Sequence, residues 1–523
     1  MQDLVRRVER GEALSLDAIH AAAHPFVAAL LHKLFPTRTI LVITGGVKTQ
    51  ENFHQDLTTW VQHIEKERPP LFFASWDILP HESKLPHADV ISERLETLVA
   101  LATQREAAET PGHVIVTNMV ALMQKTFPPG DIAKRTRTVS RGDQINPLDL
   151  IEWLEDQGYE PEAQVNHKGE IALRGGILDI FPPTSPWPMR IEFFGDEIDS
   201  IREFDPISQI SREQTDAVTI PPAGELGILK KQAGSEPAIS FATLLDHLPS
   251  DAVIVLSEPE SLDSCAADYT AQITAGDAFF TPWNEVQRRA TDEFTSVAIF
   301  ESAAEDESSE LPPLSEHETT REDEVALTLK SLDAFRPIAE RAVDLQIAEA
   351  QRREFFAQLH RWLRQGYAVH VFCNTQGERQ RFEEIWNELG FEKQFSPSTH
   401  LGTLSRGFMD EPSKLVVVTD AEIFGRYKVQ RPRRLKSPHA AASRSALDID
   451  FTEFEEGDYV VHVQHGIGRF LGLQIFDQGA GRKPTERSKR TTGQECLAIE
   501  YASSDPAQPA PKLYVPVSEA HLV

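Results

Sequence analysis

The residues that come closest to a phosphate-binding loop are Gly45-Gly46-Val47-Lys48-Thr49, which follow the apolar run at 39–43. A Walker A loop has the spacing G-x-x-x-x-G-K-[ST], because successive backbone N–H groups must wrap the phosphates. Val42 and Val47 occupy the two positions where that loop needs glycine, and a β-branched residue disfavours the positive φ values that it uses. The sequence therefore predicts an ordinary strand-to-helix turn here and no nucleotide site.

Two further motifs could hold a metal ion. Asp420 and Glu422 follow the apolar run at 414–419 and resemble the acidic end of a magnesium-binding strand. Without a phosphate loop there is no phosphate-bound magnesium for them to hold, so we interpret them as caps of the next segment. His462 and His465 would face opposite sides of a strand and have no evident third ligand, which favours structural roles for both.

The remaining reactive side chains show no catalytic arrangement. Cys265, Cys373 and Cys496 are far apart and form no C-x-x-C pair, so they support neither a disulfide framework nor a zinc site. We recognise no Ser-His-Asp, Cys-His or paired-carboxylate constellation. The sequence predicts that this chain has no catalytic, cofactor or metal site.

The elements around these motifs alternate between strands and helices in the first part of the chain. Apolar runs at 39–43, 70–74, 114–117 and 252–256 have the character of buried parallel strands, and helical sequence separates them. One such helix is expected at 92–103 with Ser92 as its cap. This alternation predicts a Rossmann-like α/β layer.

A change of pattern at 128–211 predicts a small inserted domain that contains β-strands. Ile191 and Phe193 alternate with Arg190, Glu192 and Phe194, which is the period of a strand with one buried face. Arg190 and Phe194 would then form an exposed surface of the kind enriched at interfaces. The alternative is that Phe194 packs under a loop and that Arg190 pairs with Glu192 or Asp196.

The second half of the chain carries further segments of distinct character. Residues 301–324 contain ten acidic residues and read as a solvated loop, and helical sequence is expected over 327–365. The basic stretch at 426–444 is typical of a linker, and the last section is β-rich with frequent glycine, as in a small β-barrel. We therefore predict a multidomain α/β chain with these parts: 1–127 and 212–340 as two halves of an α/β domain, 128–211 as the insertion, 345–425 as a small α/β domain, 426–451 as a linker and 452–523 as the barrel.

Composition limits the possible environment and partners. The chain has 523 residues and a formal net charge of −29, which opposes non-specific binding to phosphate backbones. No run approaches the roughly 20 apolar residues that span a bilayer, and the charged N-terminus lacks the pattern of a secretory signal. We expect a cytoplasmic protein without a membrane partner.

Two blocks resemble a known protein family. RGGILDIFPPTSPWPMRIEFFGDEIDSIREFDPISQIS at 174–211 resembles the stretch shared by UvrB and the bacterial transcription-repair coupling factors. EEGDYVVHVQHGIGRFLGL, with the later ECLAIEY and KLYVPV, resembles the CarD-like RNA polymerase interaction domain. UvrB lacks the second block, so both blocks in this order indicate the coupling-factor family.

The resemblance implies two partners. In the family the inserted domain binds UvrA, and Arg174, Arg190 and Phe194 match positions implicated in that contact. The last domain is implied to dock an edge strand beside a strand of the RNA polymerase β subunit. Leu497, Ile499 and Leu513 are our candidate contacts there, with inward packing of a small barrel as the alternative. Insertions at 479–493 and 503–511 leave the strand register open, and the first is basic enough for a nucleic-acid contact.

The resemblance also implies activities that this chain does not carry by itself. Full-length family members are ATP-dependent DNA translocases that displace stalled polymerase, with ATP and magnesium in motor domains that are absent here. We therefore expect a non-catalytic scaffold from the N-terminal part of a family member, reaching damaged or upstream DNA mainly through those motor domains. One rival is a UvrB-like helicase, which Val42 and Val47 oppose. The other is a CarD-like transcription regulator without a repair role.

Overall fold

The computed structural model describes residues 2–64, 68–82, 84–106, 110–233, 241–301, 329–335, 345–392, 394–424, 457–462, 466–476, 494–501 and 511–516. The expected acidic loop beyond Glu301, the basic linker, His465 and both insertions of the last section lie outside these residues. The chain divides into two compact units, Met1–Arg431 and Pro432–Val523, which are described separately. None of the helices in the described ranges is long and apolar enough to cross a membrane.

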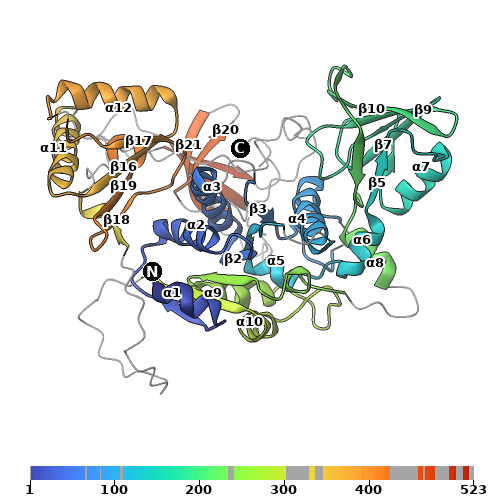
Figure 1. The fold of residues 1–523 in the computed structure, drawn as a ribbon, viewed down its shortest axis with the longest axis horizontal. Coiled ribbons are helices and arrows are strands. Elements are labelled where there is room, and N and C mark those ends of the chain that lie inside the picture. Colours follow the sequence, from blue (N-terminus) through green and yellow to red (C-terminus); the bar gives the residue numbers. More distant parts are fainter. Residues whose placement is uncertain are drawn as a thin grey trace, which may run out of the picture. The chain divides into compact units, whose positions relative to one another are not determined.

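A six-stranded parallel sheet forms the centre of the first unit (Figure 1). The runs expected as buried strands all pair in it. Its strands, in spatial order, are β1 (Leu14–Leu16), β14 (Thr295–Ile299), β13 (Val253–Ser257), β2 (Ile40–Thr44), β4 (Val114–Asn118) and β3 (Leu71–Phe73).

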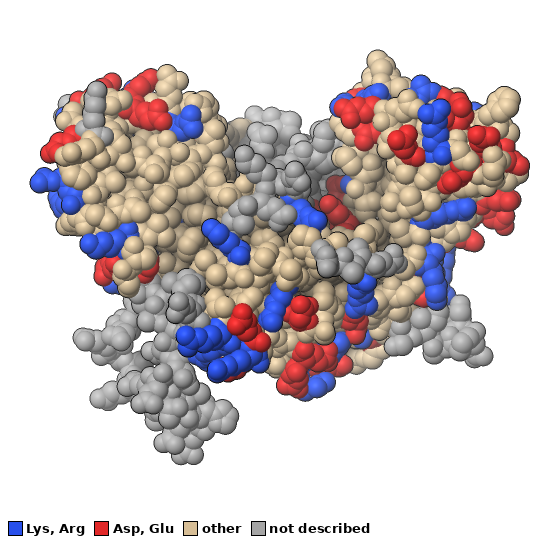
Figure 2. Space-filling model, viewed as in Figure 1, with Lys and Arg blue, Asp and Glu red and all other residues tan. Residues whose placement is uncertain are grey.

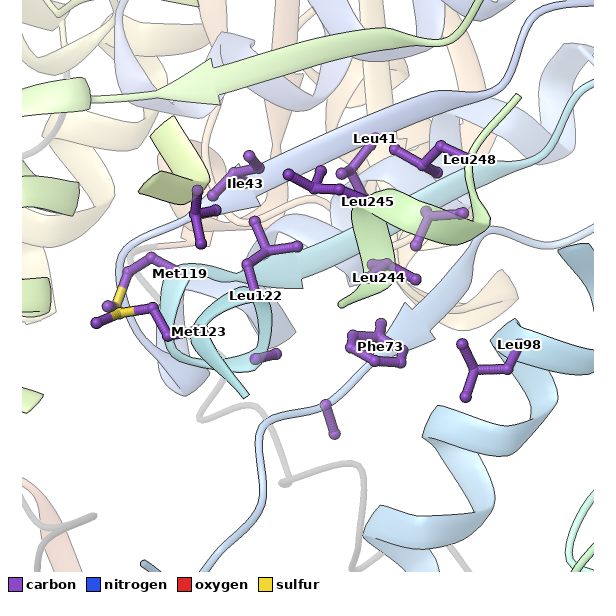
Figure 3. Packing of buried hydrophobic residues seen from close by; sticks show 14 of the residues in the cluster. Leu41, Ile43, Phe73, Leu98, Met119, Leu122, Met123, Leu244, Leu245 and Leu248 are labelled. Carbon is purple, nitrogen blue, oxygen red and sulfur yellow. The ribbon is translucent and has the colours of Figure 1, made fainter. Parts of the chain in front are cut away.

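Helices cover both faces of this sheet, which is why β2 has no polar side. Leu41 and Ile43 point into one buried cluster and Ile40 and Val42 into another, so all four side chains are buried. Figure 3 shows the first cluster, in which Leu41 and Ile43 lie among leucine and methionine side chains. The helices are α1 (Gln2–Glu9), η1 (Ala21–Ala23), α2 (His24–Leu34) and α3 (Val47–Ile64) with the second cluster, and α4 (Ala88–Glu106), α5 (Met119–Met123), η2 (Leu244–His247), α9 (Pro259–Thr270) and α10 (Trp283–Asp292) with the first.

Helix α4 begins earlier than predicted. It starts at Ala88, so Ser92 lies within the helix and does not cap it. The Ser92 hydroxyl instead donates to the backbone oxygen of Pro183 and accepts from Lys168 Nζ at 2.7 Å. Ser92 therefore contacts the segment that is inserted later in the sequence, a role that local helix patterns do not reveal.

The insertion contains a second six-stranded sheet, packed against one helix. In spatial order the strands are β11, β10, β9, β8, β7 and β6. Figure 1 shows α7 (Pro147–Asp156) beside this sheet, and Leu150 and Leu154 of α7 are fully buried. The bounds are β6 (Glu160–Pro161), β7 (Glu170–Arg174), β8 (Ile177–Ile180), β9 (Met189–Phe194), β10 (Glu197–Phe204) and β11 (Ser211–Thr215), with α6 (Pro129–Arg135), the pair β5 (Arg137–Ser140) and β12 (Ala217–Ile220), and α8 (Leu226–Ala233) at the junction.

A third sheet completes the first unit, in the order β15, β18, β19, β16, β17. Part of the helix expected over 327–365 is not helical, because Lys330–Ser331 form a strand and Asp333–Phe335 a 3-10 turn, whereas Leu345–Arg364 is helical as predicted. The sheet therefore recruits a segment that has helical sequence. The bounds are β15 (Lys330–Ser331), η3 (Asp333–Phe335), α11 (Leu345–Arg364), β16 (Ala368–Cys373), α12 (Gln376–Glu388), β17 (Ser398–Leu401), β18 (Phe408–Asp410), β19 (Leu415–Thr419) and α13 (Asp420–Phe424).

The second unit contains an antiparallel four-stranded sheet. Its strands follow chain order: β20 (Tyr459–His462), β21 (Gly466–Phe476), β22 (Gln494–Glu500) and β23 (Lys512–Pro516). Among the described strands β20 and β23 each pair with one neighbour only, so they are the edges of an open sheet and the described strands form no closed barrel.

Candidate partner-binding surfaces

Strand β9 divides its side chains between the two faces of the inserted sheet, as the alternation predicts. Ile191 is fully buried on the face that packs against α7, whereas Phe194 is 85% exposed. The strand register places Arg190 opposite Asp179 of β8 and Arg202 of β10. Arg190 and Phe194 therefore lie on the face turned away from α7, and Phe194 is not packed under a loop.

Arg190 is held by a residue that the sequence pattern did not point to. Its Nε and Nη2 donate to the two oxygens of Asp179 at 2.7 and 2.8 Å, and its guanidinium lies 4.6 Å from the ring centre of Phe204. The hydrogen bond to Asp179 is the main cause that raises the pKa of Arg190 above its usual value. The guanidinium is therefore already bound to a carboxylate and stands half-buried.

Glu192, the partner that the alternative interpretation gave to Arg190, is bound elsewhere. It forms an ion pair with Arg202, and Ser200 Oγ donates to it at 2.8 Å. The Ser200 hydrogen bond is the first cause that lowers the pKa of Glu192. Figure 2 shows acidic and basic side chains interleaved over the part that carries α7, β9 and β10, so the visible side has no patch of a single charge there.

Arg174 lies at the same end of the sheet as Phe194. The backbone N–H of Phe193 donates to Gly176 O at 2.8 Å, which sets the turn between β7 and β8 beside the end of β9. Arg174 is exposed and its Nε donates to Ala163 O at 3.1 Å. The three predicted contact residues thus share one face, with Arg174 and Phe194 at its end and Arg190 further along β9.

The candidate polymerase contacts are placed differently from the prediction. Leu497 and Ile499 lie in β22, which is paired on both sides, and both are fully buried with Phe470 in the core of the second unit. Their side chains are inaccessible, as the barrel-packing alternative foresaw. Leu513 lies half-buried on the edge strand β23.

Two exposed apolar residues of the same unit were missed. Tyr459 and Ile467 are 69% and 68% exposed. In the register of β20 and β21, Ile467 lies opposite Val461, two residues from Tyr459, so both side chains share the face opposite buried Val460. Strand alternation around Val460 was the signal that could have found Tyr459.

The residues considered for metal or nucleotide binding have other partners. Asp420 accepts from Asn374 N and Nδ2 at 3.0 and 2.6 Å, and Glu422 accepts from Thr419 N at 2.8 Å and from Gly407 N at 3.1 Å. Burial is the main cause that raises the pKa of Asp420 to about 6. Glu422 therefore caps the start of α13, as predicted, whereas Asp420 binds Asn374 after β16 and does not cap the segment that follows it. Within the described ranges no group of three or more His, Cys, Asp or Glu side chains could hold a metal.

The backbone after β2 leads into α3 through a short turn. Helix α3 begins directly at Val47, only two residues after Gly45. A Cβ atom at Gly45 would lie 3.2 Å from Ser261 Oγ and 3.4 Å from Cys265 Sγ, so α9 approaches the turn closely. The segment forms the strand-to-helix turn that the sequence predicts.

Comparison with known proteins matches both parts of the chain. Residues 138–226 match the model of the UvrB interaction domain, and residues 454–523 match that of the CarD-like/TRCF RID domain. Transcription-repair-coupling factors of Bacillus subtilis and Escherichia coli are each 26% identical to it over 95% and 92% of this chain, and that of Myxococcus xanthus is 25% identical over 99%. The chain spans 44%, 42% and 46% of those relatives. The two domain matches in this order, with similarity along nearly the whole chain, agree with the resemblance to the transcription-repair-coupling factors.

Proposed function

We propose that this chain is the partner-binding part of a transcription-repair coupling factor, which holds stalled RNA polymerase through its second unit and recruits UvrA through the inserted sheet. One observation carries the UvrA side: Phe194, an aromatic side chain 85% exposed to solvent, stands at the end of a rigid strand inside the match to the UvrB interaction domain. Exposed aromatic residues on rigid elements are typical anchors of protein interfaces.

The finer parts of the proposal follow the family. A Rossmann-like first layer, a CarD-like last domain and a cytoplasmic location belong to it. So do the domain limits given above, except that Lys330–Ser331 join the sheet of the small α/β domain. The proposal also includes docking on the polymerase β subunit. It further includes a motor, outside this chain, that uses ATP and magnesium to move on DNA. A CarD-like regulator without a repair role is not favoured, because the similarity extends over 92 to 95% of the chain and includes the UvrB interaction domain.

The polymerase contact is best sought on accessible atoms of the second unit. Strands β20 and β23 are the edges of the described sheet, where a partner strand can be added, and Leu513 on β23 is half-buried. Tyr459 and Ile467 add an exposed apolar pair beside β20. We propose that these positions, and not Leu497 or Ile499, supply side-chain contacts to polymerase.

The UvrA proposal is tested by calorimetry with purified UvrA. The wild-type chain is expected to bind, and the Phe194→Ala variant to bind at least about tenfold more weakly, as for an interface hot spot. The variant Leu148→Ser serves as a control, because Leu148 is 67% exposed on α7, on the other side of the sheet. Equal binding by Phe194→Ala and wild type would overturn the assignment of this surface.

A parallel titration tests the second unit with RNA polymerase core enzyme. Tyr459→Ser should weaken binding without changing the unfolding transition, because the side chain is exposed. Leu513→Ser should weaken binding and also lower stability, because Leu513 packs against the core of the unit. Leu497→Ala should instead destabilise the unit by about 3 kcal/mol, as expected for a buried leucine. Undiminished binding by both Ser variants would contradict the proposed contact positions.

A further inference from the structure

The connection between β10 and β11 is a tightly hydrogen-bonded loop. The side chain of Asp205 accepts from the backbone N–H groups of Ile207 and Ser208, each at 2.9 Å. The N–H of Asp205 donates to Ile210 O at 2.9 Å, and the N–H of Gln209 donates to Asp205 O at 2.7 Å. These four bonds close the segment at both ends and at its tip, so its backbone is fixed in one conformation.

This fixed loop presents two apolar side chains to solvent. Ile207 is 77% exposed and Ile210 is 67% exposed. A single exposed isoleucine is common on protein surfaces, but two within four residues of a hydrogen-bonded loop form a small exposed apolar patch. A loop whose backbone is already closed by hydrogen bonds loses little backbone freedom on binding, which favours affinity.

The loop belongs to the same face of the inserted sheet as Arg190. The side chain of Gln209 connects the loop to this face through two hydrogen bonds. Its Oε1 accepts from Arg190 Nη2 at 3.5 Å, and its Nε2 donates to Val165 O at 3.4 Å. Val165 packs with Phe181 and Phe204 on that side of the sheet, whereas α7 covers the other. Arg190 therefore stands between this loop and Phe194, which lies four residues further along β9.

We infer that the loop at 205–210 is a second anchor for the partner of this face, inserting Ile207 and Ile210 into an apolar depression on UvrA. The inference rests on the proposed function, and it extends the surface from one end of the sheet to the other. The centre of the face carries two ion pairs, Arg190–Asp179 and Glu192–Arg202, in which each charge is neutralised by a partner within the chain. Apolar anchors at both ends around a polar centre give a partner a fixed orientation. The match to the UvrB interaction domain, residues 138–226, includes the loop.

The test is UvrA binding by the full chain carrying Ile207→Ser and Ile210→Ser together. Both side chains are exposed, so the double variant should keep the wild-type unfolding transition. Its dissociation constant for UvrA should rise about tenfold. The control is Leu148→Ser, which removes a side chain as exposed as Ile210 from the opposite side of the same sheet and should bind as wild type.

The possible results separate this inference from the proposed function. If Phe194→Ala loses affinity while the double Ser variant binds as wild type, the loop is no anchor and the UvrA assignment stands. Equal losses in the double Ser variant and in Leu148→Ser would also overturn the inference, because the effect would then reflect general loss of apolar surface. If the wild-type chain does not bind UvrA at all, the proposed function itself fails and the inference falls with it.

Discussion

Glu225 and Arg94 form a fully buried ion pair that joins the two halves of the first α/β domain across the insertion. Arg94 lies in α4, before the inserted sheet in the sequence, and Glu225 lies after that sheet, directly before α8. Arg94 Nε is 2.6 Å from Glu225 Oε2. Trp76 Nε1 and Thr126 Oγ1 also donate to Glu225, at 2.8 and 2.7 Å. The base of the insertion is therefore held by a satisfied polar network in the core, where loss of one member is costly.

Glu225→Gln should destabilise the first unit strongly. The substitution keeps the shape of the side chain but leaves the Arg94 charge buried without its counter-charge, which costs about 3 kcal/mol. Urea unfolding followed by circular dichroism measures the loss. Asp292→Asn is the control, because its ion pair with Arg288 is exposed and should contribute less than about 1 kcal/mol. Equal effects of the two substitutions would contradict the structural role of the buried pair.

Arg190→Ala should lower stability as well as any affinity for UvrA. It removes the bidentate partner of Asp179, whose side chain is only 5% exposed. We expect a cost of about 2 kcal/mol, reduced from that of a fully buried pair because Arg190 is partly in solvent. Phe194→Ala should change the unfolding free energy by less than about 0.5 kcal/mol. Thermal unfolding of both variants checks this difference, and a stable Arg190→Ala protein would show that Asp179 finds another partner.

Gly402→Ala should weaken the packing of the third sheet against α3. A Cβ atom at Gly402 would clash with Thr59 Cγ2, at the point where Thr59 Oγ1 donates to Thr403 O at 2.7 Å. Overpacking of this kind costs about 1 to 3 kcal/mol. Fluorescence of Trp60, whose ring centre lies 5.1 Å from that of Phe372, reports the change.

Gly377→Ala is the matched control for Gly402. Gly377 lies in α12, and a Cβ atom there would meet no atom within 4 Å. Alanine is the better helix former, so this variant should be unchanged or more stable by up to about 1 kcal/mol. A loss of stability at Gly377 equal to that at Gly402 would contradict the contact with Thr59 as the cause.

The stability of the packing between the third sheet and α3 should also depend on pH, and two sets of titrating groups change it in opposite directions. His370 Nδ1 lies 3.0 Å from His400 Nε2, and burial lowers the pKa of both rings, with His63 adding to the effect on His400. Their contribution to stability is present above the unfolded pKa near 6.5 and is lost as pH falls. Asp56 on α3 accepts from Ser405 N at 2.9 Å, and burial raises its pKa to about 7. Its contribution is present below about pH 4 and is lost as pH rises through 7.

Asp56→Asn removes the opposing contribution of Asp56, because asparagine keeps an acceptor for Ser405 but does not titrate. Urea unfolding of this variant between pH 7 and pH 5 should show a loss of stability on acidification. Adding His400→Gln to the variant should make that loss smaller. If the two proteins show the same pH dependence, the paired rings do not control this interface.

The sequence predicted those features that depend only on the pattern of neighbouring residues along the chain. Four consecutive apolar residues in β2 marked a strand covered on both sides, and alternation in β9 placed Arg190 and Phe194 on one face. The partner of Arg190 could not be predicted, because it depends on the register that sets Asp179 of β8 opposite to it. The burial of Leu497 likewise depends on β23 pairing beside β22, a contact across residues that no local pattern connects.

One chain is proposed to hold polymerase and UvrA at the same time, through separate surfaces. Mass photometry of the chain mixed with RNA polymerase core enzyme and UvrA can detect such an assembly. We expect a complex that contains all three proteins, and a complex of chain and polymerase alone when Phe194→Ala replaces the wild type. A mixture in which UvrA displaces polymerase, or in which UvrA never joins the chain, would contradict this proposal.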